Sequence, residues 1–291
     1  MLRVTESMLF QQVTNSIRGA QKRAYDAQTV AQTGLRVNRL SDDPLAASRA
    51  NILSSTLERL SGMETVANRA TEELTVAESV LGEATTIYSR AREIAIKGAN
   101  ASMGADSRAA LAGEIDGLRE QLLSLGNTRV ADVYVFGGYQ TTSEPFDQQG
   151  GYSGDSGVRS GEIAPGTTVS MNVPGNQAFT GGVDVFKALE DLSQSLMAND
   201  GDAVGKHLTN LEDGFLQLNN ARGRTGVYLG HLRSGEALRY QVESSAMVHR
   251  TEAVEADINE AFNELAHTQF SLQSAIAQAQ SILQGLKNGL R

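Results

Sequence analysis

The last segment of the chain decides the fold: INEAFNELAHTQFSLQSAIAQAQSILQGLKNGL, residues 258–290. Its apolar side chains recur at alternating steps of three and four residues, which places them on one face of an α-helix. Only one seam position, Gln269, is polar. The pattern therefore predicts a coiled-coil seam of almost five heptads. The seam positions are Ile258, Phe262, Leu265, Gln269, Leu272, Ile276, Ala279, Leu283, Leu286 and Leu290.

A matching pattern stands near the start of the chain, where residues 10–31 alternate in the same way and then stop at Gly34. These side chains are mostly small, and small residues facing large ones let two helix axes approach closely. Residues 1–50 carry seven basic and four acidic groups, whereas residues 250–291 carry three basic and five acidic groups. Charge therefore favours pairing of the two ends modestly. The N-terminal positions are Phe10, Val13, Ile17, Ala20, Ala24, Ala27 and Ala31.

Proline marks where the helices can run, because a proline inside a helix costs about 3 kcal/mol. The sequence predicts one helix from Pro44 to near Gly98, capped by Asp42 or Asp43, and a further helix from about Asp106. The other prolines are clustered in the middle of the chain, at Pro145, Pro165 and Pro174.

The middle of the chain has a strand-like composition. Residues 133–136 are β-branched or aromatic, and Gly137-Gly138 and residues 139–142 follow, which predicts a hairpin. Residues 167–173 form another strand candidate, and the helical pattern returns at 184–197 and at about 203–221. Gly223, Gly226 and Gly230 then predict a break or a distorted turn over residues 222–231.

These patterns together predict a mainly α protein. We expect a long antiparallel helical bundle or coiled coil, built from the N- and C-terminal halves, with a small inserted β domain. The expected division is into terminal coiled-coil segments (1–44 and 255–291), a helical-bundle domain (45–130 and 184–254) and the inserted β domain (131–183).

Composition and charge disfavour several classes of function. The net charge of −9 disfavours nucleic acid as a partner. The chain has no cysteine, which excludes disulfides, thiolate metal sites and cysteine catalysis. No run of 18 apolar residues predicts a membrane span, and the opening residues predict no cleavable secretory signal.

The sequence shows no convincing catalytic or ligand-binding motif. Residues 201–207 superficially resemble a phosphate loop, but they are one residue short and have His207 where a hydroxyl is needed. No two of the four histidines lie three or four residues apart, so no helical metal site is predicted. The adjacent carboxylates Asp42 and Asp43 fit a helix cap better than acid–base chemistry. We therefore expect no catalytic residue, cofactor or metal.

The apolar C-terminal seam runs on to Leu290, although the last residues of most chains are loosely held. A lone helix of this length is marginally stable in water, and an exposed apolar stripe of this size usually marks an interface. The ends therefore meet another copy, a related protein or a chaperone. The alternative is an ordinary antiparallel helix pair that closes one domain on itself, and periodicity does not separate the two.

Three segments resemble the flagellin-like hook-associated proteins. They are RVTESMLF (3–10), TGLRVNRLSDDPLAA (33–47) and VFGGYQT (135–141), the last followed by Pro145-Phe146, and the C-terminal heptads are similar to the family's terminal helix. On this resemblance we assign a polymerisation interface. It comprises the first five N-terminal stripe positions, the C-terminal seam except Ala279, and Arg36, Asn38, Asp42 and Asp43.

The resemblance implies a structural subunit that joins the bacterial flagellar hook to its filament. It implies export in an unfolded state through the flagellar type III channel, after a transient cytoplasmic stage, and an extracellular place in the flagellum. The partners it implies are further copies in a ring, the first hook-associated protein, flagellin, and a cytoplasmic export chaperone at the C-terminal helix.

Other functions are alternatives at this point. Flagellin, the filament subunit, shares the 36–43 region and the terminal helices, whereas the segment around Gly137-Gly138-Tyr139 favours the hook-associated proteins. A cytoplasmic helical scaffold or signalling protein would keep both ends folded, whereas polymerisation predicts rapid cleavage of roughly the first 45 and last 35 residues in the monomer. A hydrolase or adhesin housed in the β domain is a third class.

Overall fold

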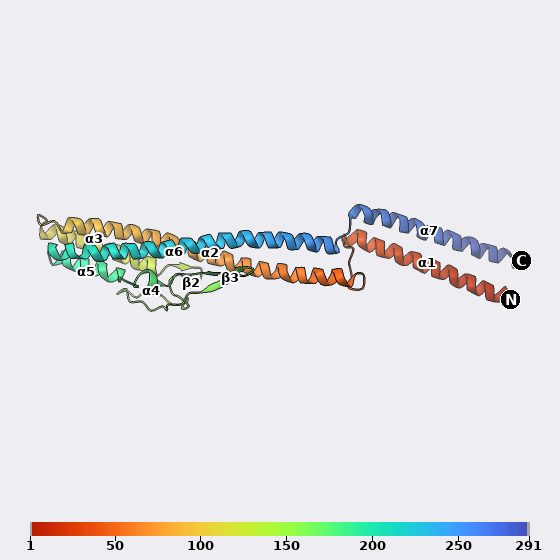
Figure 1. The fold of residues 1–291 in the computed structure, drawn as a ribbon, viewed down its shortest axis with the longest axis horizontal. Coiled ribbons are helices and arrows are strands. Elements are labelled where there is room, and N and C mark those ends of the chain that lie inside the picture. Colours follow the sequence, from red (N-terminus) through yellow and green to blue (C-terminus); the bar gives the residue numbers. More distant parts are fainter. Residues whose placement is uncertain (1, 290–291) are drawn as a thin grey trace. The chain divides into compact units, whose positions relative to one another are not determined.

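Long helices make up most of the chain. The computed structural model describes the backbone of residues 2–289 and the side chains of residues 8–285. Within that part of the chain no helix is both long and apolar enough to cross a membrane. The predicted fold class, mainly α with a small β insertion, is confirmed (Figure 1). The helices are α1 (Leu2–Thr33), α2 (Pro44–Gly98), α3 (Ala105–Gly126), α4 (Gly175–Ala178), α5 (Val185–Met197), α6 (Gly201–Val254) and α7 (Ile258–Gly289).

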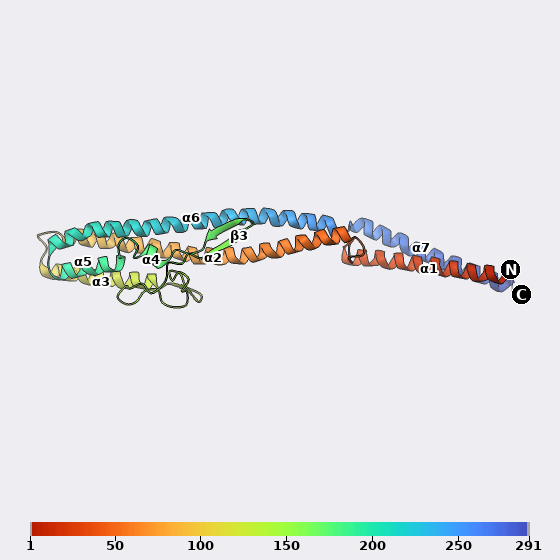
Figure 2. The same ribbon diagram turned by 60° about the horizontal axis from the view of Figure 1, so that its bottom comes forward.

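The chain divides into two compact units. Unit 1 comprises residues 1–58 and 243–291, and unit 2 comprises residues 59–242, so that each takes part of α2 and α6. In unit 1, α1 and α7 lie side by side and antiparallel, with the start of α1 and the end of α7 at the same end of the pair (Figures 1 and 2). The three-part division made from the sequence stays a prediction.

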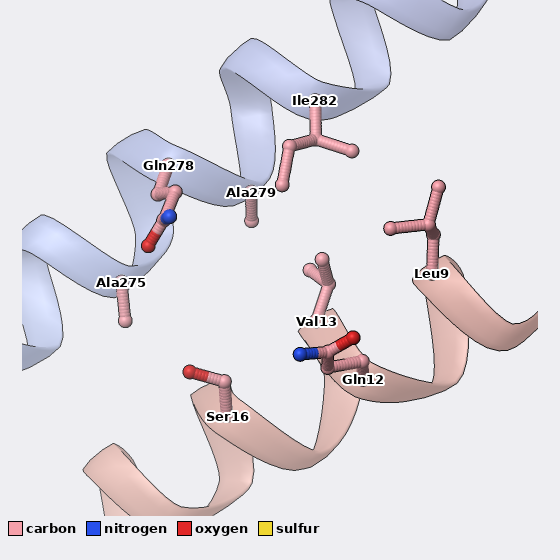
Figure 3. A pocket seen from close by; sticks show the side chains of 8 residues that line it. All are labelled: Leu9, Gln12, Val13, Ser16, Ala275, Gln278, Ala279 and Ile282. Carbon is pink, nitrogen blue, oxygen red and sulfur yellow. The ribbon is translucent and has the colours of Figure 1, made fainter.

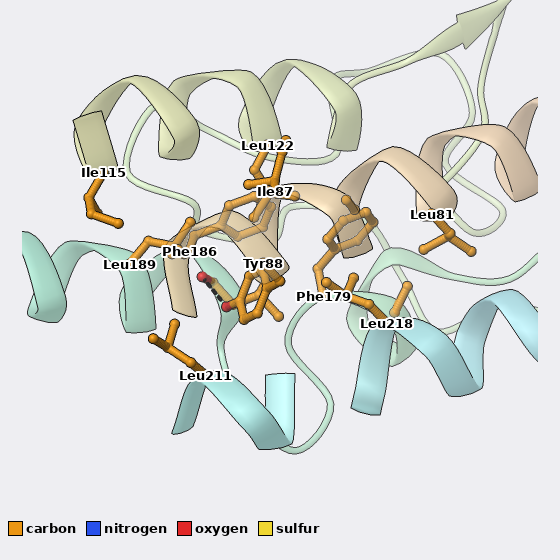
Figure 4. Close-up of a cluster of buried hydrophobic side chains, with 14 of the residues drawn as sticks. Leu81, Ile87, Tyr88, Ile115, Leu122, Phe179, Phe186, Leu189, Leu211 and Leu218 are labelled. Atoms are coloured by element: carbon orange, nitrogen blue, oxygen red, sulfur yellow. Dashed lines mark hydrogen bonds between the residues drawn. The ribbon is translucent and has the colours of Figure 1, made fainter. Parts of the chain in front are cut away.

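The core of unit 2 is formed by α2, α3, α5 and α6 around a group of aromatic side chains. Tyr88 is fully buried there, and its hydroxyl donates a hydrogen bond to the carbonyl of Val185 at 2.6 Å (Figure 4). A Cβ at Gly214 on α6 would lie 2.5 Å from the Tyr88 ring. The small residue at that position therefore lets α6 approach α2 closely. The neighbouring aromatic residues are Phe136, Phe146, Phe179 and Phe186.

The inserted β elements form two small antiparallel sheets. β1 (Arg129–Val130) pairs with β2 (Val133–Tyr134), and β3 (Ser160–Ala164) pairs with β4 (Thr167–Ser170). The second pair agrees with the strand predicted from residue 167.

The predicted hairpin turn at Gly137-Gly138 is wrong. The turn of the first hairpin lies at residues 131–132, and Ala131 adopts a positive φ of 50°. Gly138 also has a positive φ, of 73°, and a Cβ there would lie 2.2 Å from the carboxylate of Asp155. That carboxylate accepts a hydrogen bond from the amide of Tyr139 at 2.8 Å. The glycine pair thus serves a close loop contact, which its sequence does not distinguish from a turn.

The predicted break over residues 222–231 is also wrong, because α6 runs unbroken from Gly201 to Val254. A glycine in a helix costs only about 1 kcal/mol relative to alanine. The opposite side of the same turns is anchored by Ala221, Thr225 and Leu232, all of which are buried. Packing on that side outweighs the low helix propensity of the glycines.

Candidate assembly interface

The alanine-rich stripe of α1 faces α7, as the sequence predicts. Ala20, Ala24 and Ala27 are buried, and Val13 and Ile17 are half-buried. Phe10, at the start of the stripe, is 58% exposed. The stripe is therefore covered by α7 in its second half and progressively uncovered toward the N-terminal end.

On α7, the residues that turn toward α1 differ in part from the predicted seam. Leu265 and Leu272 are half-buried and Ala279 is buried, so these three predicted positions do face α1. The other half of the contact comes from a set of mostly small residues that we call the inner row. It consists of Ala261, Thr268, Ala275 and Ile282.

The remaining predicted positions form an outer row that is exposed, and this corrects the expectation that the large residues of α7 pack onto the alanines of α1. The inner row and, from Phe262 onward, the outer row both repeat every seven residues, so periodicity alone does not separate them. The inner row is selected because small side chains let the helices come closer. The outer row consists of Ile258 (61% exposed), Phe262 (55%), Gln269, Ile276 (38%) and Leu283 (48%). The side chain of Leu286 and the whole of Leu290 lie outside the described residues.

Burial of Thr268 costs little, because its hydroxyl donates to carbonyl oxygens of its own helix, at 2.8 Å to Glu264 and 3.0 Å to Leu265. Gln269 beside it is exposed, and so it does not set the register of the α1–α7 pair. A hydrophobicity count favours the larger outer row. Sequence reasoning therefore missed the inner row, which only its own seven-residue repeat could have indicated.

The α1–α7 pair does not fill its own interior toward the termini. A groove of about 160 Å³ opens between the two helices there. Figure 3 shows Leu9 and Val13 of α1 and Ile282 of α7 around this space. Its walls are completed by Gln12, Ser16, Ala275, Gln278 and Ala279.

Unit 1 has the opposite distribution of apolar side chains from an ordinary core. Among the side chains that the structure describes, the buried hydrophobic residues of unit 1 are all alanines apart from Val37, and both clusters of buried hydrophobic side chains lie in unit 2. Fourteen of the 21 large hydrophobic residues described as exposed belong to unit 1, although unit 2 is the longer of the two. Exposed apolar surface of this extent usually marks an interface.

The linker between α1 and α2 is fastened to the segment between α6 and α7. Gly34, with φ of 69°, ends α1 as predicted, and Leu35 forms a β-bridge with Glu255. The structure supplies the partner that the sequence did not give for Arg36. Its guanidinium donates to the carbonyl of Ala253 at 2.8 Å and pairs with Asp43 at 3.3 Å. The backbone bridge and the Arg36 side chain together hold this linker against the segment between α6 and α7.

The two aspartates of the linker have separate roles. Asp42 accepts the amides of Asn38 at 3.1 Å and Arg39 at 2.8 Å, which closes the loop before α2. Asp43 accepts the amide of Ala46 at 3.0 Å and so caps α2, as predicted. This amide, and then Arg36, hold the pKa of Asp43 below its ordinary value of 3.8. The side chain of Asn38 donates to the carbonyl of Leu35 at 2.6 Å, within the loop.

The N-terminal half of the chain matches a known family. Residues 4–141 match the N-terminal helical region of bacterial flagellin. Flagellar hook-associated protein 3 of Salmonella typhimurium is 33% identical over 180 residues, which are 61% of this chain and 57% of that protein. The Escherichia coli protein of the same name is 36% identical over 151 residues, or 52% of this chain and 48% of that protein. The chain thus spans about half of the length of these curated relatives.

A solved structure shares the fold. The flagellar junction protein of Legionella pneumophila superimposes with a TM-score of 0.59, over 71% of this chain and 100% of that chain. Its sequence identity is 15%, so this likeness concerns the fold alone. The matched flagellin region includes nearly all of α1, the linker with Arg36 and all of α2. The chain is therefore similar to flagellin in its N-terminal helical region and to flagellar hook-associated protein 3 over about half of its length.

Proposed function

We propose that the chain is a non-enzymatic structural subunit of the bacterial flagellum, an adapter that joins the hook to the flagellin filament. On the hook side it contacts the first hook-associated protein, on the filament side flagellin, and laterally further copies of itself in a ring. The observation that carries this proposal is the exposed apolar surface of unit 1, above all the outer row of α7.

The free energy for assembly comes from covering that surface. Burying a Leu, Ile or Phe side chain completely contributes about 1.5–3 kcal/mol. Ile258, Phe262, Ile276 and Leu283 are each more than a third exposed in the single chain. A neighbouring subunit that covers these four side chains therefore gains a substantial part of the free energy needed to hold the assembly together, without any change in unit 2.

The same surface explains why the subunit needs protection before export. In the cytoplasm the outer row would associate with any apolar surface. We propose that an export chaperone covers the C-terminal helix until the chain enters the type III channel, and that the subunit then assembles outside the cell. The absence of cysteine fits a chain that is threaded unfolded and reaches an oxidising exterior.

The test compares two aspartate substitutions on α7. Ile276→Asp places a charge in the outer row, and we expect it to abolish assembly and motility, because a charge buried in an apolar contact is costly. Ser274→Asp places the same charge on an exposed side of α7 that faces away from both rows, and we expect wild-type motility. Leu272→Asp, at a half-buried position, should disrupt the α1–α7 pair as well as assembly. Far-ultraviolet circular dichroism checks that unit 2 stays folded.

Wild-type motility in cells carrying Ile276→Asp as their only copy would contradict the assignment of the outer row. Flagellin is the second candidate, because the matched family region is that of flagellin. If the purified wild-type chain grew unaided into long homopolymeric filaments, the filament subunit would be the better description.

A further inference from the structure

We propose that neighbouring copies also meet through unit 2, the exposed face of α6 on one copy packing against the exposed face of α3 on the next. This inference rests on the proposed function as a self-assembling subunit, and it names the surface by which copies meet outside the terminal helices. The two faces have opposite charge, and each is built so that another helix can approach closely.

The α6 face carries three exposed apolar side chains among glycines and small polar residues along its centre, and an arginine on each border. By helical spacing, its central residues share one side of α6, where Leu216 is 49% exposed and Val227 is 54% exposed. Arg224 and Arg233 stand on either side of this centre, and neither forms a salt bridge among the described side chains. Arg224 donates only to the neutral side chain of Gln177, at 3.1 Å. The central residues are Leu216, Asn220, Gly223, Gly226, Val227, Gly230, Ser234 and Leu238.

The α3 face carries the opposite charge. Asp106, Asp116 and Glu120 are exposed on one side of α3, and within the described part of the chain none of them is in a salt bridge. The basic residues of α3 do not neutralise this face, since Arg108 is buried and the side chain of Arg119 is only 18% exposed. Between the acidic groups lie the small exposed residues Ala109, Ala110, Gly113 and Gly117.

The charges on the two faces have matching spacing. Nine residues separate Arg224 from Arg233, which is about 14 Å along a helix, and ten separate Asp106 from Asp116, about 15 Å. An antiparallel or parallel crossing at a shallow angle can therefore bring both arginines opposite carboxylates. Complementary charge of this kind directs which surfaces of two proteins meet.

The glycines set how closely the helices can approach. A Cβ built at Gly113, Gly117, Gly226 or Gly230 meets nothing within 4 Å, so packing inside the chain does not require these glycines. Each costs about 1 kcal/mol of helix stability relative to alanine. A second helix lying directly on these glycines could approach closely, because no side chain stands between the two backbones. Close backbones allow extensive van der Waals and Cα–H···O contact.

The two faces are different surfaces of one chain, so the contact is heterologous. In Figure 2, α6 follows the upper edge of unit 2 and α3 the lower edge. One copy can therefore use both faces at once, and successive copies form a ring if the rotation closes.

The experiment reverses the charge of each face in turn, in the full-length chain. Variant A carries Arg224→Glu and Arg233→Glu, and variant B carries Asp116→Arg and Glu120→Arg. All chains also carry Leu272→Asp, which removes the contribution of the terminal helices, and association is measured by analytical ultracentrifugation at low salt. We expect A alone and B alone to associate at least tenfold more weakly than the parent. An equimolar mixture should recover to within threefold, because each altered face then meets its complement.

A third variant separates contact from folding. Gly226→Ala with Gly230→Ala should raise the thermal midpoint of the monomer slightly, because alanine is the better helix former, and yet weaken association. If these glycines served only the fold of the single chain, the alanine substitutions would change the thermal midpoint and the strength of association in the same direction.

The proposal is contradicted if the parent stays monomeric at every concentration, if A and B associate like the parent, or if the mixture gains nothing. The assignment of the terminal helices is tested separately. Normal assembly of an otherwise wild-type chain that carries Ile276→Asp would contradict that assignment. That result would leave the outcome for the two faces of unit 2 unaffected.

Discussion

At the scale of single residues, the linker shows how one ion pair can connect distant parts of the chain. Arg36 reaches Asp43, which lies seven residues later, and also the carbonyl of Ala253, which lies 217 residues later. Asp43 at the same time caps α2 through the amide of Ala46. Protonation of one carboxylate therefore weakens both the start of α2 and the link between the two chain halves.

The pKa of Asp43 is lowered in the folded chain, first by the amide of Ala46 and then by Arg36. Its contribution to stability is therefore fully present above its ordinary value of 3.8 and is lost as the pH falls through the lower folded value. In an NMR titration we expect the Ala46 amide to report a midpoint below 3.8. Arg36→Met should move that midpoint upward, and Asp43→Asn should remove the titration.

Arg39→Met is the matched control, since it removes a positive charge from the same linker without touching Asp43. It should leave the midpoint nearly unchanged. A wild-type midpoint at or above 3.8, or equal shifts from Arg36→Met and Arg39→Met, would show that the ion pair does not act on Asp43.

At the scale of elements, a buried arginine joins the ends of two helices. Arg108, in the first turns of α3, is only 5% exposed. Its guanidinium donates to the carbonyl of Gly98, the last residue of α2, at 2.8 Å, and to that of Asn100 at 2.9 Å. It also donates to the carbonyl of Asn199, just past the end of α5, at 3.3 Å. Helix C-termini carry partial negative charge, so these carbonyls can hold a buried cation without a carboxylate.

Replacing Arg108 would leave several buried carbonyls without donors. Each such group costs about 1–3 kcal/mol, so we expect Arg108→Met to destabilise unit 2 by roughly 3 kcal/mol in denaturant unfolding. Arg92→Met is the control, because Arg92 pairs with Glu212 near the surface, where such pairs are worth about 1 kcal/mol or less. Equal unfolding midpoints for the two variants would refute the capping role of Arg108.

The elements also show what sequence can predict. The ends of α1 and α2 at Gly34 and Gly98 follow from local chemistry and were predicted well. The course of α6 through Gly226 was predicted wrongly, because the buried residues on its other side decide it. The prediction of which α7 residues face α1 was correct for only some positions. Two rows of residues share the same period, and only the approach distance of the helices separates them.

At the scale of the whole molecule, the two units differ in which side chains they bury. Unit 2 buries large side chains such as Tyr88, Phe179 and Phe186, and its glycines at tight contacts let helices and aromatic rings approach. Unit 1 buries alanines and exposes Phe262 and Ile276. Unit 2 therefore covers its large apolar side chains by itself, whereas unit 1 leaves several of its own exposed.

The distribution also shows which part of the terminal helices' exposure follows from the sequence and which part does not. Sequence periodicity predicted that the terminal helices carry the exposed apolar stripes of the chain. Which residues remain exposed after α1 and α7 have paired depends on side-chain size at Ala261, Ala275 and their neighbours, and this becomes visible only in three dimensions.

The most direct test of this account is hydrogen–deuterium exchange along the full chain, measured in the dilute monomer and again in the assembled state. Few buried apolar contacts mean low local stability. We therefore predict fast amide exchange in α1 and α7 of the monomer, slow exchange in α2, α3 and α5 within unit 2, and strong protection of α1 and α7 on assembly. Terminal helices that exchange as slowly as the core of unit 2 in the dilute monomer would contradict the account.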